Sequence, residues 1–74
     1  MQSLPKEFLN KRVRIDLRNS YLEGFVRDSD ENMNLLVENA EWGYDGNKEK
    51  VAGGKKIFVN GTGVVGVSLI PQST

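Results

Sequence analysis

Apolar residues alternate with charged ones early in the chain, and this period constrains its fold more than any other feature. Val13, Ile15 and Leu17 are separated by charged side chains, and the alternation returns over 33–37. A period of two places successive side chains on opposite faces of a strand, so each segment predicts a strand with one face in the core. In a chain of 74 residues, this pattern predicts one small, mainly β domain.

The rest of the chain predicts a short helix and further strands. Residues 3–10 have apolar side chains at helical spacing, with Ser3 as a cap and Pro5 in the first turn, and predict a short N-terminal α-helix. Further strands are expected over 21–27, where Gly24 marks a sharp bend, and over 57–59 and 64–69. The expected fold is therefore a short helix followed by a five-stranded, strongly bent antiparallel sheet or small barrel.

The segment 40–55 is rich in glycine and charge and predicts a long connection with strand extensions on either side. Asp45-Gly46 is a suitable tight-turn pair within it. Trp42 and Tyr44 could form a stacking platform or pack on the barrel, and packing is the commoner use of aromatic residues in small folds.

Composition excludes several classes of function. The chain has no Cys and no His, which removes disulfides, His/Cys zinc sites and imidazole acid–base chemistry. The remaining polar residues form no catalytic constellation, so we expect no enzyme, no metal and no cofactor. Because so small a core gives only about a few kcal/mol of stability, self-association is expected to add to it.

Charge and hydropathy bear on the partners and the cellular location expected for the chain. Ten basic and ten acidic residues cancel, which gives no support to broad phosphate-driven binding. The N-terminal residues lack the apolar stretch of a signal peptide, and no apolar run approaches the length of a membrane span. We therefore expect a soluble cytoplasmic protein with no membrane partner.

Three short motifs imitate known sites. Residues 61–66 spell G-x-G-x-x-G, but strand residues follow where a dinucleotide-binding loop needs a helix. Residues 28–39 resemble a calcium loop but lack its turn glycine and its final carboxylate. Residues 60–62 form a glycosylation sequon, for which a turn is the simpler interpretation.

A fourth motif is more specific. Asp30-Glu31-Asn32-Met33-Asn34-Leu35 begins six residues after Gly24, and a later run reads "IFVNGTGVVGV". With these motifs the chain resembles the Sm/LSm proteins, a ring-forming RNA-binding family, and more distantly Hfq. The resemblance covers nearly the whole chain as a single domain, 1–74. It divides into the helix at 3–10, a first Sm motif at 12–39, a variable connection at 40–55 and a second Sm motif at 56–70.

The resemblance implies both an assembly and a binding site. It implies a homo-oligomeric ring of six to eight subunits, with seven favoured, in which the fourth strand of one subunit pairs with the fifth strand of the next. It also implies that two loops face the pore and bind single-stranded, U-rich RNA. The residues carried over to that site are Asp30, Asn32, Asn34, Asn60, Gly61 and Thr62.

The resemblance assigns a role to most of these residues. Asn34 would hydrogen-bond a base edge, and Asp30 would orient Asn34. Asn32 stands where the family often has a histidine or an aromatic residue that stacks on the base, and Asn60 stands where it has an arginine. Gly61 would let backbone N–H groups approach the ligand.

Further departures are Ser20, Gly63 and Gly66, which stand where the family usually has Gly, Asn and a larger residue respectively. Together with the neutral charge balance, they imply weaker or differently selective RNA binding. On the strands, Lys11, Arg12, Arg14, Arg18 and Arg27 could contact phosphate.

Three hypotheses follow. The first is a non-enzymatic ring that binds short U-rich RNA. The second is an Sm-fold ring that has lost RNA binding and serves as a protein scaffold, which Asn32 and Asn60 favour. The third is a monomeric SH3-like or Tudor-like peptide reader, which the scattered aromatic residues disfavour.

Overall fold

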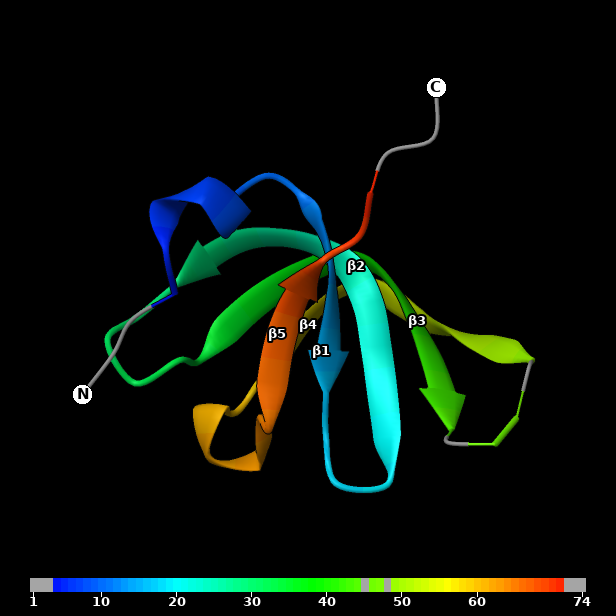
Figure 1. Cartoon of the computed structure of the whole chain (residues 1–74). Coiled ribbons are helices and arrows are strands. Elements are labelled where there is room, and N and C mark those ends of the chain that lie inside the picture. The colour runs from blue at the N-terminus through cyan, green and yellow to red at the C-terminus, as the bar shows by residue number, and fades with distance from the viewer. Residues whose placement is uncertain (1–3, 45, 48, 72–74) are drawn as a thin grey trace.

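The chain forms one bent five-stranded sheet (Figure 1). The computed structural model describes residues 4–44, 46–47 and 49–71, so that Ser3 and Asp45 lie outside the described residues. All neighbouring strands are antiparallel, in the order β4-β3-β2-β1-β5, which confirms the predicted mainly β fold class. The elements are η1 (Lys6–Phe8), β1 (Arg12–Asp16), β2 (Ser20–Ser29), β3 (Leu35–Tyr44), β4 (Lys50–Val59), η2 (Gly61–Gly63) and β5 (Gly66–Leu69).

The predicted N-terminal α-helix is only a single 3-10 turn, η1. Leu9 already has extended backbone angles, and Asn10 is left-handed with φ 60°. The chain therefore leaves the helical conformation directly after Phe8. The apolar spacing that suggested a helix serves packing instead, since Leu4 is buried and Phe8 and Leu9 pack against the core.

The core confirms the alternation read from the sequence. Residues of β1 that point inward are buried, whereas the charged residues between them are only partly buried. Among the described residues, no polar or charged residue is buried. The largest fully buried side chains are Val13, Ile15, Leu22, Val26, Leu35 and Val37.

The sheet bends where its pairing register shifts. The β2–β3 register shifts at Gly24, between Glu23 and Phe25, and the β3–β4 register shifts after Ala40. A Cβ added to Gly24 would lie 2.6 Å from a methyl group of Val37 and 2.9 Å from the carbonyl oxygen of Glu38. Glycine therefore allows β3 to cross close over β2, as the sequence predicted for a bend at this position.

The segment expected to be a long connection, 40–55, is mostly strand. β3 continues to Tyr44 and β4 begins at Lys50, so the link between the two strands is much shorter than expected. The expected strand extensions are therefore present and longer than expected. Trp42 packs against the core, in agreement with the packing interpretation, whereas Tyr44 is 56% exposed.

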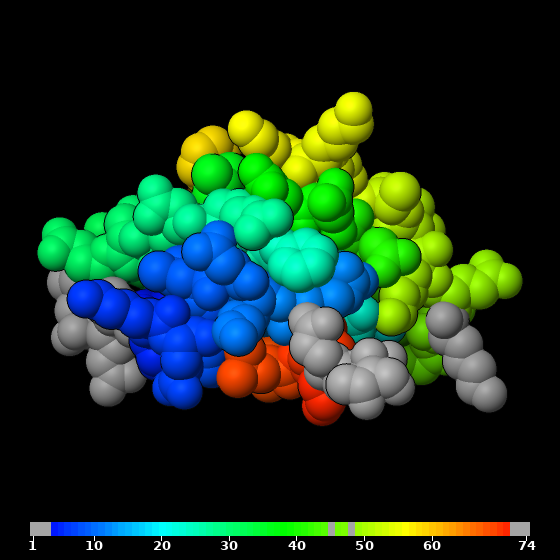
Figure 2. Space-filling view, turned by 90° about the horizontal axis from the view of Figure 1, so that it is seen from above, coloured from blue at the N-terminus to red at the C-terminus, as the bar shows by residue number. Residues whose placement is uncertain are grey.

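The two ends of the sheet are left without a partner strand in the chain. β4 and β5 are the edge strands, and they lie on opposite sides of the molecule, as the yellow and the orange-red surfaces in Figure 2 show. Both carry exposed apolar side chains, with Phe58 83% exposed on β4 and Leu69 45% exposed on β5. No helix in the described part of the chain is long and apolar enough to span a membrane.

Candidate functional site

Two loops that are distant in the sequence meet at one end of the sheet. The first joins β2 to β3 and the second, containing η2, joins β4 to β5. Together they line a hollow at the surface, and the structure brings five of the six predicted site residues to its wall; the sixth, Asp30, is hydrogen-bonded to Asn34. The lining residues are Glu31, Asn32, Met33, Asn34, Asn60, Gly61 and Thr62.

Asp30 organises the first loop. Its Oδ1 accepts hydrogen bonds from the backbone N–H groups of Asn32 at 2.8 Å and Asn34 at 2.9 Å, and its Oδ2 accepts one from Asn34 Nδ2 at 2.9 Å. Between them, Met33 takes the left-handed conformation with φ 64°, so it lies in the loop and not in the strand expected over 33–37. An aspartate that accepts from the backbone of its own loop is a frequent turn former.

These hydrogen bonds also affect the charge state of Asp30. The backbone N–H of Asn34 and then its side-chain amide stabilise the carboxylate, and they hold the pKa of Asp30 below its ordinary value. Asp30 is therefore ionised at neutral pH and presents only acceptor oxygens to Asn34. This fixes which way the Asn34 amide points, with its nitrogen toward Asp30.

Asn34 connects the two loops. Its Oδ1 accepts a hydrogen bond from the backbone N–H of Gly61 at 2.8 Å, while its Nδ2 donates to Asp30. Asp30 therefore contacts Asn34 directly, which is the contact that its predicted role of orienting Asn34 requires. The contacts form one chain, Asp30–Asn34–Gly61, running from the first loop to the second.

Gly61 also fits tightly against the first loop. A Cβ at this position would overlap the carbonyl oxygen of Asn32 and would lie 2.8 Å and 2.9 Å from the carbonyl carbon and oxygen of Met33. Backbone atoms occupy the space where a side chain would be. The missing side chain, predicted to let backbone N–H groups approach a ligand, here admits the neighbouring loop, and the Gly61 N–H donates to Asn34.

Asn60 is engaged with its own turn. Its Oδ1 accepts hydrogen bonds from the backbone N–H and the Oγ1 of Thr62, both at 3.0 Å, and so caps η2. Asn32 and Thr62 also line the hollow, and both are exposed. In this structure the side chain expected to take the place of an arginine thus holds the second loop in its turn.

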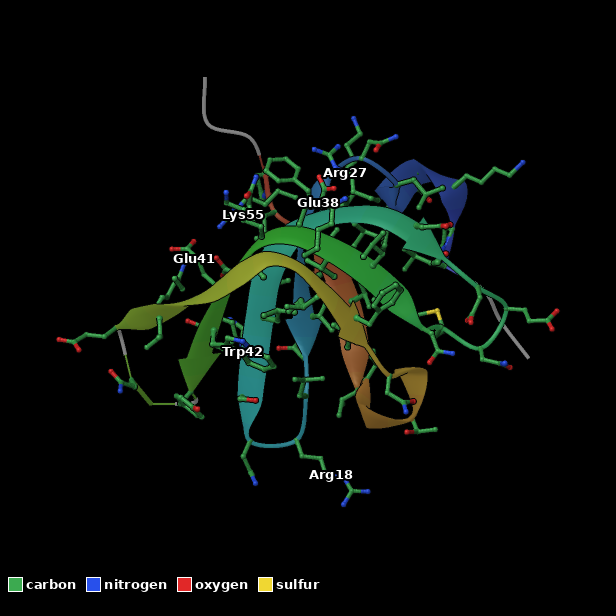
Figure 3. The ribbon with its side chains drawn as sticks, turned by 180° about the vertical axis from the view of Figure 1, so that it is seen from behind. Arg18, Arg27, Glu38, Glu41, Trp42 and Lys55 are labelled. Atoms are coloured by element: carbon green, nitrogen blue, oxygen red, sulfur yellow. The ribbon has the colours of Figure 1, made fainter. Side chains whose placement is uncertain are left out.

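Arginines expected to contact phosphate are held in ion pairs on the outer face of the sheet. Arg12 pairs with Glu41 at 2.6 Å, and Arg27 pairs with Glu38 at 2.7 Å; the latter two lie side by side in Figure 3. Arg14 pairs with Asp16 at 2.8 Å. Arg18, by contrast, projects from the β1–β2 turn (Figure 3).

Comparison with protein-family models gives a match to the LSM domain over residues 3–69. The chain belongs to the LSM-domain family. The match includes both loops of the hollow and all five strands. No curated protein sequence matches the chain significantly.

Solved structures of Sm proteins resemble this LSM domain closely. A heptameric archaeal Sm protein is 33% identical, with a TM-score of 0.78, covering 89% of this chain and 94% of its own. The P. aerophilum SmAP1 heptamer is 32% identical, with a TM-score of 0.79 and coverage of 90% and 88%. The Pyrococcus abyssii Sm protein, solved in complex with a uridine heptamer, is 28% identical, with a TM-score of 0.75 and coverage of 86% and 89%.

The structure adds residues near the site that sequence reasoning did not select. Met33 and Glu31 line the hollow itself, and Phe58 borders a second hollow beside Asp30 and Asn34. A signal for Phe58 was available in the alternation of β4. Ile57 and Val59 face the core, which leaves Phe58 facing outward.

The contact between Gly61 and the first loop predicts a loss of stability in Gly61→Ala. The added methyl must displace the Asn32–Met33 backbone, and we expect a loss of about 1–3 kcal/mol in the free energy of unfolding. Chemical denaturation measures this. Gly63→Ala in the same turn is the matched control, since a Cβ there meets no atom within 4 Å. An equal effect of both substitutions would contradict the described contact.

The hydrogen bonds to Asp30 predict its titration. Its carboxyl should titrate below the ordinary aspartate value of about 3.9, because the folded protein stabilises the charged form. This stabilisation is complete above the ordinary value and is lost as the pH falls through the lowered pKa. NMR of the Asp30 side-chain carbonyl measures the midpoint, with Asn34→Ala, which removes the side-chain donor, as the comparison. A midpoint at or above the ordinary aspartate value would contradict the geometry.

Proposed function

We propose that this LSM protein forms a homomeric ring, with seven subunits favoured, and binds short single-stranded U-rich RNA at its pore-facing loops. We propose a binding role without catalysis, in the cytoplasm. Three things support the proposal: the family, the two open sheet edges, and the organised pair Asp30–Asn34. Among the solved relatives, two are described as heptamers and one as a complex with a uridine heptamer.

The observation that carries the proposal is the way the Asn34 amide is held. An amide has two N–H donors and two oxygen lone pairs. Its bonds to Asp30 and Gly61 use one of each within the described part of the chain, which leaves one donor and one acceptor position on the amide. Uracil presents a complementary pair, its N3–H and a neighbouring carbonyl oxygen, and single-stranded RNA is commonly read along such base edges.

The open edges support the ring. An edge strand with unpaired backbone groups and exposed apolar residues tends to pair with another chain. Here the two edges belong to β4 and β5, so pairing β4 of one subunit with β5 of the next is a head-to-tail contact. Such contacts produce a closed ring when the rotation per subunit closes.

Weak, weakly salt-dependent binding follows from the charges. Arg12, Arg14 and Arg27 are paired with carboxylates, and Asn60 supplies no positive charge at the site. Few phosphates are therefore neutralised, and the affinity should fall only slowly with rising salt.

The first test combines mass and RNA binding. Light scattering should give a ring, and fluorescent oligo-U should bind more tightly than oligo-A at a stated salt concentration. Asn34→Ala should lower oligo-U affinity about tenfold or more and remove the preference, because a bidentate base contact is worth about 1–3 kcal/mol. A monomer at micromolar concentration would overturn the ring and favour a monomeric peptide reader.

The alternative function is a ring without RNA binding that serves as a protein scaffold. The self-bonded Asn60 and the non-aromatic Asn32 favour it, since neither supplies a charge or a stacking plane. A ring that binds neither oligo-U nor oligo-A, with no change on Asn34→Ala, would select the scaffold.

A gain of function gives an independent prediction. Asn60→Arg places a charge at the rim of the hollow, so oligo-U affinity should rise and its salt dependence should steepen. Fluorescence titration at several salt concentrations measures both. Asn47→Arg adds the same charge at the exposed β3–β4 link, away from the hollow, and is the matched control. Equal gains in both variants would show a general charge effect and count against the site.

A further inference from the structure

Aromatic side chains in this protein lie over glycines of neighbouring strands. Tyr21 on β2 covers Gly43, its direct partner on β3, and its ring fills the space of the missing side chain. Trp42 on β3 covers Gly53 on β4, where an added Cβ would lie 2.7 Å from two indole atoms. In each pair the glycine leaves a hollow that an aromatic ring fills, a recognised means of stabilising glycine within sheets.

Gly66 differs from the other described strand glycines, because an added Cβ at each of those would meet a neighbouring atom within 4 Å. Gly66, the first residue of β5, has open space where a Cβ would be. Phe58 on β4 is 83% exposed, the highest value among the exposed large hydrophobic residues. Gly66 and Phe58 lie on the two edge strands, at opposite ends of the sheet.

Both residues face the same side of the sheet. Phe58 pairs with Leu36, whereas its neighbour Ile57 pairs with the buried Val37. Phe58 therefore points away from the core. In the same way Gly66 is placed on the outer face, because the next residue of β5, Val67, packs against the core.

The connection between the edge strands sets their register in a ring. β4 ends at Val59 and β5 begins at Gly66, with 60–65 between them. Consider β4 of one subunit running antiparallel to β5 of the next, with the 60–65 loops of all subunits gathered round the pore. Phe58, the last outward-facing residue of β4, then comes opposite Gly66, the first outward-facing residue of β5.

We infer that Phe58 of each subunit lies over Gly66 of the next copy of this chain and anchors the subunit interface. The inference rests on the proposed ring and adds the residue pair that stabilises it. Glycine weakens a strand, and the open space at Gly66 would accept a larger residue in an isolated subunit. The aromatic ring of the neighbouring subunit gives that space an occupant.

A double-mutant cycle tests the pair. Phe58→Ala should raise the subunit concentration at which half the rings dissociate at least about tenfold, as for a central aromatic anchor. Native mass spectrometry over a dilution series measures this concentration. Gly66→Val should also weaken the ring, because its side chain takes the space of Phe58. The double variant should lose less than the sum of the two single losses.

Controls separate folding from assembly. Phe58 is exposed and Gly66 has open space, so circular dichroism of both variants should match the unmodified protein. Val51→Ala, an exposed apolar change at the far end of β4, is the matched control and should leave the ring intact.

Other results would overturn the inference. Additive losses of ring stability, or an unchanged ring in Phe58→Ala, would contradict the Phe58–Gly66 contact but not the proposed ring. Phe58 also borders a hollow lined by Asp30, Asn34 and Asn60. Weaker oligo-U binding in Phe58→Ala, with unchanged ring stability, would assign Phe58 to base stacking instead. A monomeric unmodified protein would overturn the ring and the pair together.

Discussion

The contact of Gly61 with the backbone of Asn32 and Met33 holds the rest of the arrangement in place. It joins the loop that ends β2 to the loop that connects the two edge strands. Because β4 ends and β5 begins at that second loop, the contact fixes where both open edges lie. The hydrogen bonds from Asp30 through Asn34 to Gly61 fasten the same junction. One junction therefore positions the candidate binding site and the surfaces proposed for assembly.

The burial of β1 residues and the position of the first loop could be predicted from the sequence, because each depends on a short local pattern. The alternation about Ile15 predicts burial directly, and the spacing of Gly24 from Asp30 and Asn34 predicts the family and the first loop. The long strands over 40–55 were harder to predict, since glycine and charge are typical of loops. Gly53 lies in a strand, and the Trp42 ring occupies the space that a side chain at this position would need. The residues next to Gly53 in the sequence give no sign of this contact.

The sequence predicted which residues lie together at this end of the sheet better than it predicted their contacts. The residues lie together as expected, yet the bond from Thr62 to Asn60 and the donation from Gly61 to Asn34 depend on how two loops approach each other. The helical spacing of Leu4 and Phe8 likewise predicted contacts with the core but not the backbone conformation. It marks residues that pack, whereas the extended Leu9 and the left-handed Asn10 end the turn after Phe8.

Two of the ion pairs on the outer face link strands that are not neighbours. Arg12 on β1 reaches Glu41 on β3 across β2, and Lys50 on β4 reaches Glu23 on β2 across β3, with Arg12 and Glu23 themselves 3.8 Å apart. At room temperature such exposed pairs contribute little. The cost of removing water from charged groups falls as temperature rises, so linked pairs contribute more when the protein is hot. The linked ion pairs thus connect four strands, β1 to β4. Their contribution to stability should increase on heating, when hydrophobic stabilisation no longer grows.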